Sequence, residues 1–206
     1  TGNAGITFED KTTAGATITG GYSGIYAKNS GEGALSITTT GETTGGGEYG
    51  DGISATNSSK GTDLTINAAT TTGGLFGIFA SNNGKGALSI TTTGTTTGTK
   101  YDGIYARNSA AGTDLTIVTG EFDAEGNLIE AVDTTGGDNG IKAINSGKGA
   151  LSITTTGTTT GNGTSLRTDD DDYYAAGIYA KIDNANSRGD LTINAATTTG
   201  GYRGIY

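Results

Sequence analysis

The part of this sequence with the clearest potential for chemistry is a run of four carboxylates followed by two aromatic side chains: Asp169, Asp170, Asp171, Asp172, Tyr173 and Tyr174. Several carboxylate oxygens in one place are what a hard cation such as Ca²⁺ requires. The run lacks the alternating Asp-x-Asp spacing of a loop that wraps one ion, and the chain lacks the Gly-Gly-x-Gly-x-Asp repeat of calcium β-rolls. We therefore interpret the run as a solvated loop whose like charges repel one another, with no metal and no cofactor. We expect the two tyrosines to favour contact with a protein or a glycan.

A second group of acidic residues lies in residues 118–139, a segment without any basic residue. Its acids are Glu121, Asp123, Glu125, Glu130, Asp133 and Asp138. This segment and residues 161–176 both lengthen the repeat described below, at what we interpret as the same place in each copy. We therefore predict two inserted loops side by side on one flank. Glu121, Asp123 and Glu125 join the four-aspartate run as candidate binding residues.

The composition argues against catalysis and against two classes of partner. Histidine is absent, so there is no imidazole base, and cysteine is absent, so there is no thiol or disulfide. The basic residues are scattered and the acids fall in expected loops, whereas β-helical enzymes that cleave polysaccharides need carboxylates clustered in a cleft. We therefore expect no enzyme. A formal net charge of −9 argues against nucleic acids and anionic membrane surfaces as partners.

Two short phrases recur along the chain and indicate its architecture. The first is Gly-Ile-Tyr-Ala or a close variant, and its copies begin at Gly24, Gly52, Gly77, Gly103, Gly140, Gly177 and Gly204, with a degenerate first copy at Gly5. The second is Leu-Ser-Ile or Leu-Thr-Ile, and its copies begin at Leu35, Leu64, Leu88, Leu115, Leu151 and Leu191, with a first occurrence at Ala16-Thr17-Ile18. Both phrases alternate apolar and polar residues, which is typical of a half-buried β-strand.

One such strand is too short to bury its apolar face alone, but stacked copies form a continuous core. The sequence therefore predicts an all-β fold: a right-handed parallel β-helix, or β-solenoid, of about seven to eight coils, with residues 1–206 as a single segment of a longer protein. The handedness follows from the general preference of parallel crossovers. Runs of threonine, as in residues 91–97, are expected to form a third strand in each coil. Half of these threonines then face inward, where their hydroxyl groups should hydrogen-bond to each other or to backbone.

Position-specific residues within the repeat predict an asparagine ladder and an outer row of side chains. Five residues after the phrase glycine, an amide recurs at Asn29, Asn57, Asn82, Asn108 and Asn145, and Asp10 holds this place in the first copy. Stacked coils would align these amides as an internal ladder. The outward residues of the first phrase are Tyr26, Ser54, Phe79, Tyr105, Lys142, Tyr179 and Tyr206. Their rings are expected to stabilise neighbouring coils by stacking, and a row of exposed rings also suits a sugar or a partner chain. Exposed threonine rows also suggest ice binding, which the uneven coil lengths argue against.

The pattern Gly-Ile-Tyr-Ala-x-Asn followed by Gly-x-Leu-Ser/Thr-Ile resembles the passenger region of bacterial autotransporters, the surface proteins of type V secretion, and in particular their adhesin and haemagglutinin branch. The likeness covers nearly the whole chain. It implies a right-handed β-helix outside the cell, at the bacterial surface or secreted. It also implies adhesion to host-cell or matrix proteins or glycans, or self-association, with binding carried by variable loops such as 118–139 and 161–176. The alternatives are a structural stalk with no binding of its own and a secreted ligand for a host receptor.

Overall fold

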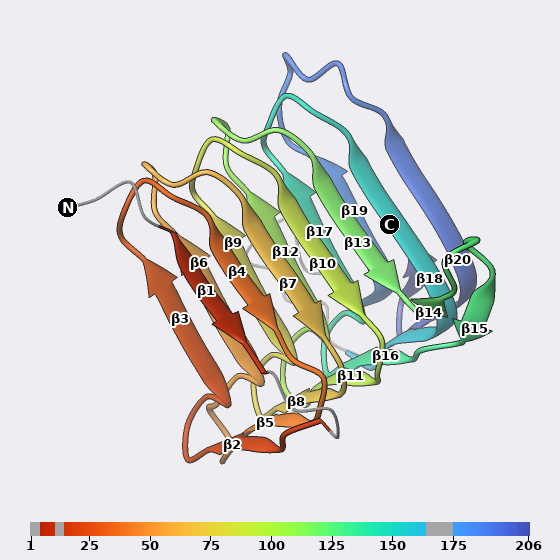
Figure 1. Cartoon of the computed structure of the whole chain (residues 1–206). Coiled ribbons are helices and arrows are strands. Elements are labelled where there is room, and N and C mark those ends of the chain that lie inside the picture. Colours follow the sequence, from red (N-terminus) through yellow and green to blue (C-terminus); the bar gives the residue numbers. More distant parts are fainter. Residues whose placement is uncertain (1–4, 11–14, 164–174) are drawn as a thin grey trace.

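The computed structural model describes residues 5–10, 15–163 and 175–206. The described residues form β-strands and turns, with no helix that could cross a membrane. The strands stack in parallel along one axis, so that each turn of the chain lies directly on the previous one (Figure 1). The prediction of an all-β protein with stacked parallel strands, consistent with a β-solenoid, is confirmed.

The first face of the stack, here called the Gly-Ile face, is a seven-stranded parallel sheet built from the first phrase. Its strands are β3 (Ile25–Asn29), β6 (Ile53–Asn57), β9 (Ile78–Asn82), β12 (Ile104–Asn108), β17 (Ile141–Asn145), β19 (Ala176–Ile182) and β21 (Arg203–Ile205). Isoleucines of successive copies are in register, as in Ile25 with Ile53 and Ile53 with Ile78. The predicted alignment of these residues in one interior column is confirmed.

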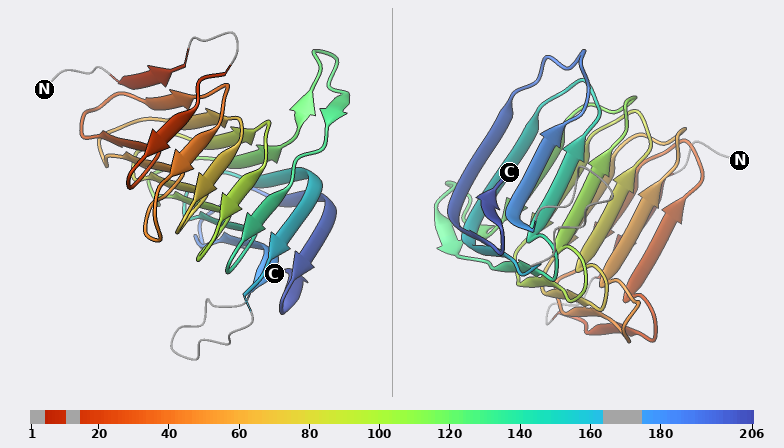
Figure 2. Two further views of the ribbon diagram at one scale, coloured as in Figure 1. Left: turned by 90° about the horizontal axis from the view of Figure 1, so that it is seen from below. Right: turned by 180° about the vertical axis from the view of Figure 1, so that it is seen from behind.

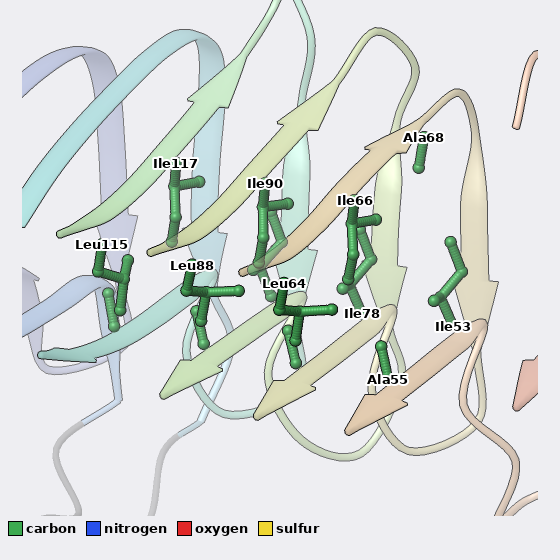
Figure 3. Close-up of a cluster of buried hydrophobic side chains, with 14 of the residues drawn as sticks. Ile53, Ala55, Leu64, Ile66, Ala68, Ile78, Leu88, Ile90, Leu115 and Ile117 are labelled. Carbon is green, nitrogen blue, oxygen red and sulfur yellow. The ribbon is translucent and has the colours of Figure 1, made fainter. Parts of the chain in front are cut away.

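The second face, the Leu face, contains the second phrase. Its strands are β1 (Ile6–Glu9), β4 (Leu35–Thr38), β7 (Leu64–Ala68), β10 (Leu88–Thr92), β13 (Leu115–Thr119) and the first parts of β18 (Leu151–Gly161) and β20 (Leu191–Gly200). All of them pair in parallel. Inner leucines and isoleucines form two columns with no exposed surface in the middle coils (Figure 3). A core only a few residues wide is enough because each coil is covered by its neighbours.

The third face, the Thr face, is formed by the threonine runs, as predicted. Its strands are β2 (Ile18–Gly20), β5 (Thr43–Gly45), β8 (Thr71–Gly73), β11 (Thr96–Gly98), β16 (Thr134–Gly136) and the last parts of β18 and β20. In β18 and β20 the chain runs from the Leu face to the Thr face without a break in the strand. The two faces therefore join into one twelve-stranded sheet.

The prediction that inward threonines find hydrogen-bond partners is wrong for most of them. Eight buried hydroxyls have no partner among the described residues: those of Thr39, Thr43, Thr92, Thr96, Thr119, Thr134, Thr155 and Thr159. Parallel pairing places equivalent threonines one above another, and their methyl groups fill the narrow interior. The backbone carbonyl groups are already engaged in the sheet ladder, so few acceptors remain for these hydroxyls.

The N-terminal coil was assigned wrongly from the sequence. Ile6 pairs with Leu35 and Phe8 with Ile37, so the stretch from Gly5 belongs to the Leu face rather than to the Gly-Ile face. Ile18 pairs with Thr43 and therefore belongs to the Thr face. The error arose because the phrases share one apolar–polar–apolar pattern, which does not identify the face. As a consequence, Asp10 lies outside the asparagine ladder.

The two insertions were predicted on one flank, and the flanking strands show that this is wrong. The first lies between β13 and β16, where the Leu face meets the Thr face. It contains an antiparallel hairpin, β14 (Glu121–Phe122) and β15 (Leu128–Glu130), which projects away from the stack (Figure 2). The second leaves after β18, where the Thr face meets the Gly-Ile face. Residues 118–119 and 134–136 belong to regular strands, so the first insertion is shorter than 118–139.

Candidate functional site at an aromatic and acidic corner

The predicted asparagine side chains form one continuous row of hydrogen bonds through the stack. Nδ2 of each residue donates to Oδ1 of the next, over 2.8, 3.0, 3.1 and 3.4 Å from Asn29 to Asn145. Each amide also bonds to backbone carbonyl groups in its own turn, as Asn82 does with Gly86 and Ala87. The row is buried and therefore acts on the structure of the turns, not on a ligand. Beyond it, Asn184 donates to the carbonyl oxygen of Ser146 at 2.8 Å.

The predicted outer row of the Gly-Ile face is in register, and its rings contact one another. The rings of Phe79 and Tyr105 are stacked, with 5.2 Å between centroids and 3° between planes. Tyr26 is 72% exposed, whereas Tyr179 is 2% exposed. The expectation of exposure is wrong for Tyr179, whose ring lies 5.2 Å from that of Tyr206 and 5.3 Å from Nζ of Lys142.

A pocket of about 190 Å³ opens where the Thr face meets the Gly-Ile face. Its aromatic wall comes from Phe76, Tyr101 and Tyr105, and its polar wall includes Asp102 and Asn139. The ring of Phe76 lies 5.2 Å from that of Tyr101 and 5.7 Å from that of Tyr105. Three successive coils contribute these residues, so the pocket exists only because the coils stack. We refer to it as the corner pocket.

The carboxyl group of Asp102 is the most perturbed acid that the structure describes at this corner. It is 4% exposed, and its Oδ1 accepts two hydrogen bonds from Asn139, at 3.1 Å from the backbone N–H and 2.8 Å from Nδ2. Burial raises the pKa of Asp102 to about 6, although the bonds from Asn139 and the charge of Lys142 act in the opposite direction. The corner therefore holds a carboxyl group that titrates in mildly acidic solution.

Backbone hydrogen bonds fix the corner pocket in place. The N–H of Tyr101 donates to the carbonyl oxygen of Leu75 at 3.1 Å, and the N–H of Asp138 donates to the carbonyl oxygen of Tyr101 at 3.0 Å. Asn139 is held by its Oδ1, which accepts from the N–H of Ala176 at 2.9 Å. Side chains placed on such a ladder keep their relative positions without a ligand.

The projecting hairpin is organised by one of the predicted binding residues. Asp123 accepts hydrogen bonds from the backbone N–H groups of Glu125 and Asn127 and from Nδ2 of Asn127. These bonds, with the Asn127 side chain first, lower the pKa of Asp123. Its carboxylate therefore closes the turn, whereas Glu121 and Glu125 are exposed. Exposed apolar side chains accompany them: Phe122 at 37%, Leu128 at 50% and Ile129 at 60%.

The remaining predicted residues, Asp169 to Asp172, Tyr173 and Tyr174, lie outside the described residues. Within residues 5–10, 15–163 and 175–206, no three acidic side chains gather as a metal site would require. The corner pocket was not predicted from the sequence. One sequence feature could have indicated it: the residue directly before each phrase glycine varies, whereas the rest of the phrase repeats. The residues at this position are Ser23, Asp51, Phe76, Asp102, Asn139 and Ala176.

Comparisons of this chain with protein-family models, with curated proteins and with solved structures gave no match.

Proposed function

We propose that this chain is a surface-exposed or secreted passenger segment of the autotransporter kind, which attaches to host cells or matrix, or to other bacteria, and performs no catalysis. Its partners are proteins or glycans. In this proposal the coil is right-handed, with about seven to eight turns in a single segment. The sequence resemblance supports the export route, and the extracellular location follows from it.

The observation that carries the proposal is the hairpin of β14 and β15. It interrupts an otherwise regular stack and exposes Phe122, Leu128 and Ile129 to solvent between acidic residues. Clustered large apolar side chains on a projecting element suit contact with a partner. The acidic residues around them favour a partner surface with basic groups, because no basic residue lies in this segment.

The preceding coil contains a short turn that can replace the hairpin and so test its role in attachment. Thr92 pairs with Thr119 and Thr96 pairs with Thr134, so the turn 93–95, Thr-Gly-Thr, spans the same gap that residues 120–133 span one coil later. Exchanging 120–133 for Thr-Gly-Thr removes the hairpin and keeps the regular coil. The purified chain, coated on beads, is then scored for attachment to cultured epithelial cells and to matrix proteins.

We expect the wild-type beads to attach and the hairpin exchange to abolish most of the attachment. The triple change Phe122→Ser, Leu128→Ser and Ile129→Ser should have the same effect without shortening the chain. A matched control changes the exposed Ser59 to Gly on another turn. Undiminished attachment after the hairpin exchange would assign binding to another surface, and no attachment by the wild type would favour the stalk.

A further inference from the structure

We infer that the corner pocket binds a single neutral sugar ring, such as the terminal hexose of a glycan. This inference rests on the proposed adhesive function, because it names one ligand class for it, but it concerns a different surface from the hairpin. The volume of about 190 Å³ is below the roughly 300–1,000 Å³ of sites for drug-sized molecules. One ring fits this volume better than a peptide segment or an oligosaccharide.

The two walls of the pocket match the two kinds of surface on a sugar. Phe76, Tyr101 and Tyr105 supply apolar ring surface for the C–H face of a pyranose. Among the polar residues that line the pocket, the carboxyl group of Asp102 accepts hydrogen bonds from sugar hydroxyls, and Lys142 donates to them. A ring with one apolar face and several hydroxyl groups uses both walls together.

Asn139 is a positioning residue in this site. Both polar atoms of its side chain are committed to the protein, since Nδ2 donates to Asp102 at 2.8 Å and Oδ1 accepts from Ala176 at 2.9 Å. Asn139 therefore holds Asp102 in a fixed orientation. Because both of its bonds go to Oδ1 of Asp102, the carboxyl group is presented to the pocket in one geometry.

Charge decides against two other ligand classes. A cationic ligand such as a quaternary ammonium group would meet a like charge in the pocket, because the ammonium group of Lys142 lines it and repels a second cation. An acidic sugar would bring its carboxylate close to Asp102 and Asp138, on a chain of net charge −9. A neutral sugar avoids both conflicts.

The test is a titration of the ¹⁵N-labelled chain with D-glucose, D-galactose, D-mannose and N-acetyl-D-glucosamine at millimolar concentrations, followed by amide chemical shifts. Choline chloride and N-acetylneuraminic acid are the cationic and anionic probes. We expect saturable shifts at Asp102, Asn139 and Lys142 with at least one neutral sugar, and none with the charged probes.

A matched pair of variants identifies the carboxylate that binds. Asp102→Asn keeps an oxygen for the bonds from Asn139 but replaces an acceptor-only group, and we expect it to weaken sugar binding about tenfold or more. Asp51→Asn changes the same column two coils earlier, outside the pocket, and should leave the affinity within about twofold. It keeps the oxygen that the N–H of Phe76 approaches at 3.5 Å.

Three results would overturn the inference: no saturable shift with any of the four neutral sugars, preferential binding of choline or N-acetylneuraminic acid, or equal sugar affinity in Asp102→Asn and wild type. The attachment assay separates this failure from failure of the proposed function. If the beads attach through the hairpin and no sugar binds, only the pocket inference fails. If a sugar binds and the beads do not attach, the adhesive function fails instead.

Discussion

Nδ2 of Asn82 donates to Oδ1 of Asn108 over 3.1 Å, although 26 residues separate the two in the chain. Asn82 also accepts from Nδ2 of Asn57 at 3.0 Å and from the N–H of Gly84 at 3.1 Å. The Asn82 side chain therefore connects three coils, and it is buried, so water cannot replace a lost hydrogen-bond partner.

We expect Asn82→Ala to lower the free energy of unfolding by about 3 kcal/mol, because it removes the acceptor of the Gly84 N–H, one acceptor of the Asn57 amide and the donor to Asn108. Urea denaturation followed by circular dichroism measures the loss. The control is Asn67→Ala at an exposed strand position, which should cost less than about 0.5 kcal/mol. Equal losses in the two variants would show that the row is not a stabilising element.

The buried hydroxyl groups predict a stabilising substitution. The hydroxyl of Thr96 has no partner among the described residues and its side chain is fully buried, so Thr96→Val replaces the hydroxyl by a methyl group of similar shape. The variant should gain about 1 kcal/mol, since a buried polar group without a partner is costly. Thr97→Val on the outer side of the same strand serves as control and should change little. A clear loss of stability in Thr96→Val would indicate that the hydroxyl is satisfied in solution, for example by water.

The corner carboxyl group predicts a pH dependence of stability. The pKa of Asp102 in the folded chain is about 6, above its ordinary value of 3.8, so the folded chain binds this proton more tightly than the unfolded chain does. The contribution of Asp102 to stability is therefore highest below pH 3.8, falls as the pH rises and is fully lost above about pH 6. The difference between the two pKa values corresponds to a change of about 3 kcal/mol in the free energy of unfolding.

Asp102→Asn isolates this effect because it cannot ionise. Relative to wild type, the variant should be of similar stability near pH 3.5 and more stable by up to about 3 kcal/mol at pH 7.5, measured by urea unfolding at both pH values. Asn139, Lys142 and Asp138 are the groups that act on this carboxyl, and none is altered. A difference between variant and wild type that is the same at both pH values would contradict the assignment.

The glycine of the first phrase predicts a steric limit. A Cβ atom at Gly77 would lie 2.6 Å from the carbonyl oxygen of Gly103 and 2.7 Å from Cγ2 of Thr96, whereas one at Gly21 would meet nothing within 4 Å. Gly77→Ala should therefore cost about 3 kcal/mol through overpacking, and Gly21→Ala close to nothing. Thermal unfolding of the two variants compares them directly. Tolerance of alanine at Gly77 would mean that the coils can separate locally.

Tertiary structure decided what lies at the corners. Asp102 and Asn139 are 37 residues apart and occupy the variable position before a phrase glycine, and only the stacking register brings them within 2.8 Å. The same holds for the insertions. The corner at which an insertion lies depends on its order relative to the Thr-Thr-Gly strand of its coil. The hairpin precedes Thr134–Gly136, so it lies between the Leu face and the Thr face. The second insertion follows residues 159–161, so it lies between the Thr face and the Gly-Ile face.

The sequence by itself determined the columns of the stack. Each coil contacts chiefly its neighbours, so alternation within a phrase and recurrence between phrases suffice to place Ile25 above Ile53 and Asn29 above Asn57. Alternation does not state which face a phrase occupies, and so the first coil was misplaced. Nor does it state which side chains from different coils share a corner, because that depends on the path length between strands. The regular interior could therefore be predicted from the sequence, whereas the corner pocket and the positions of the two insertions became clear only from the tertiary structure.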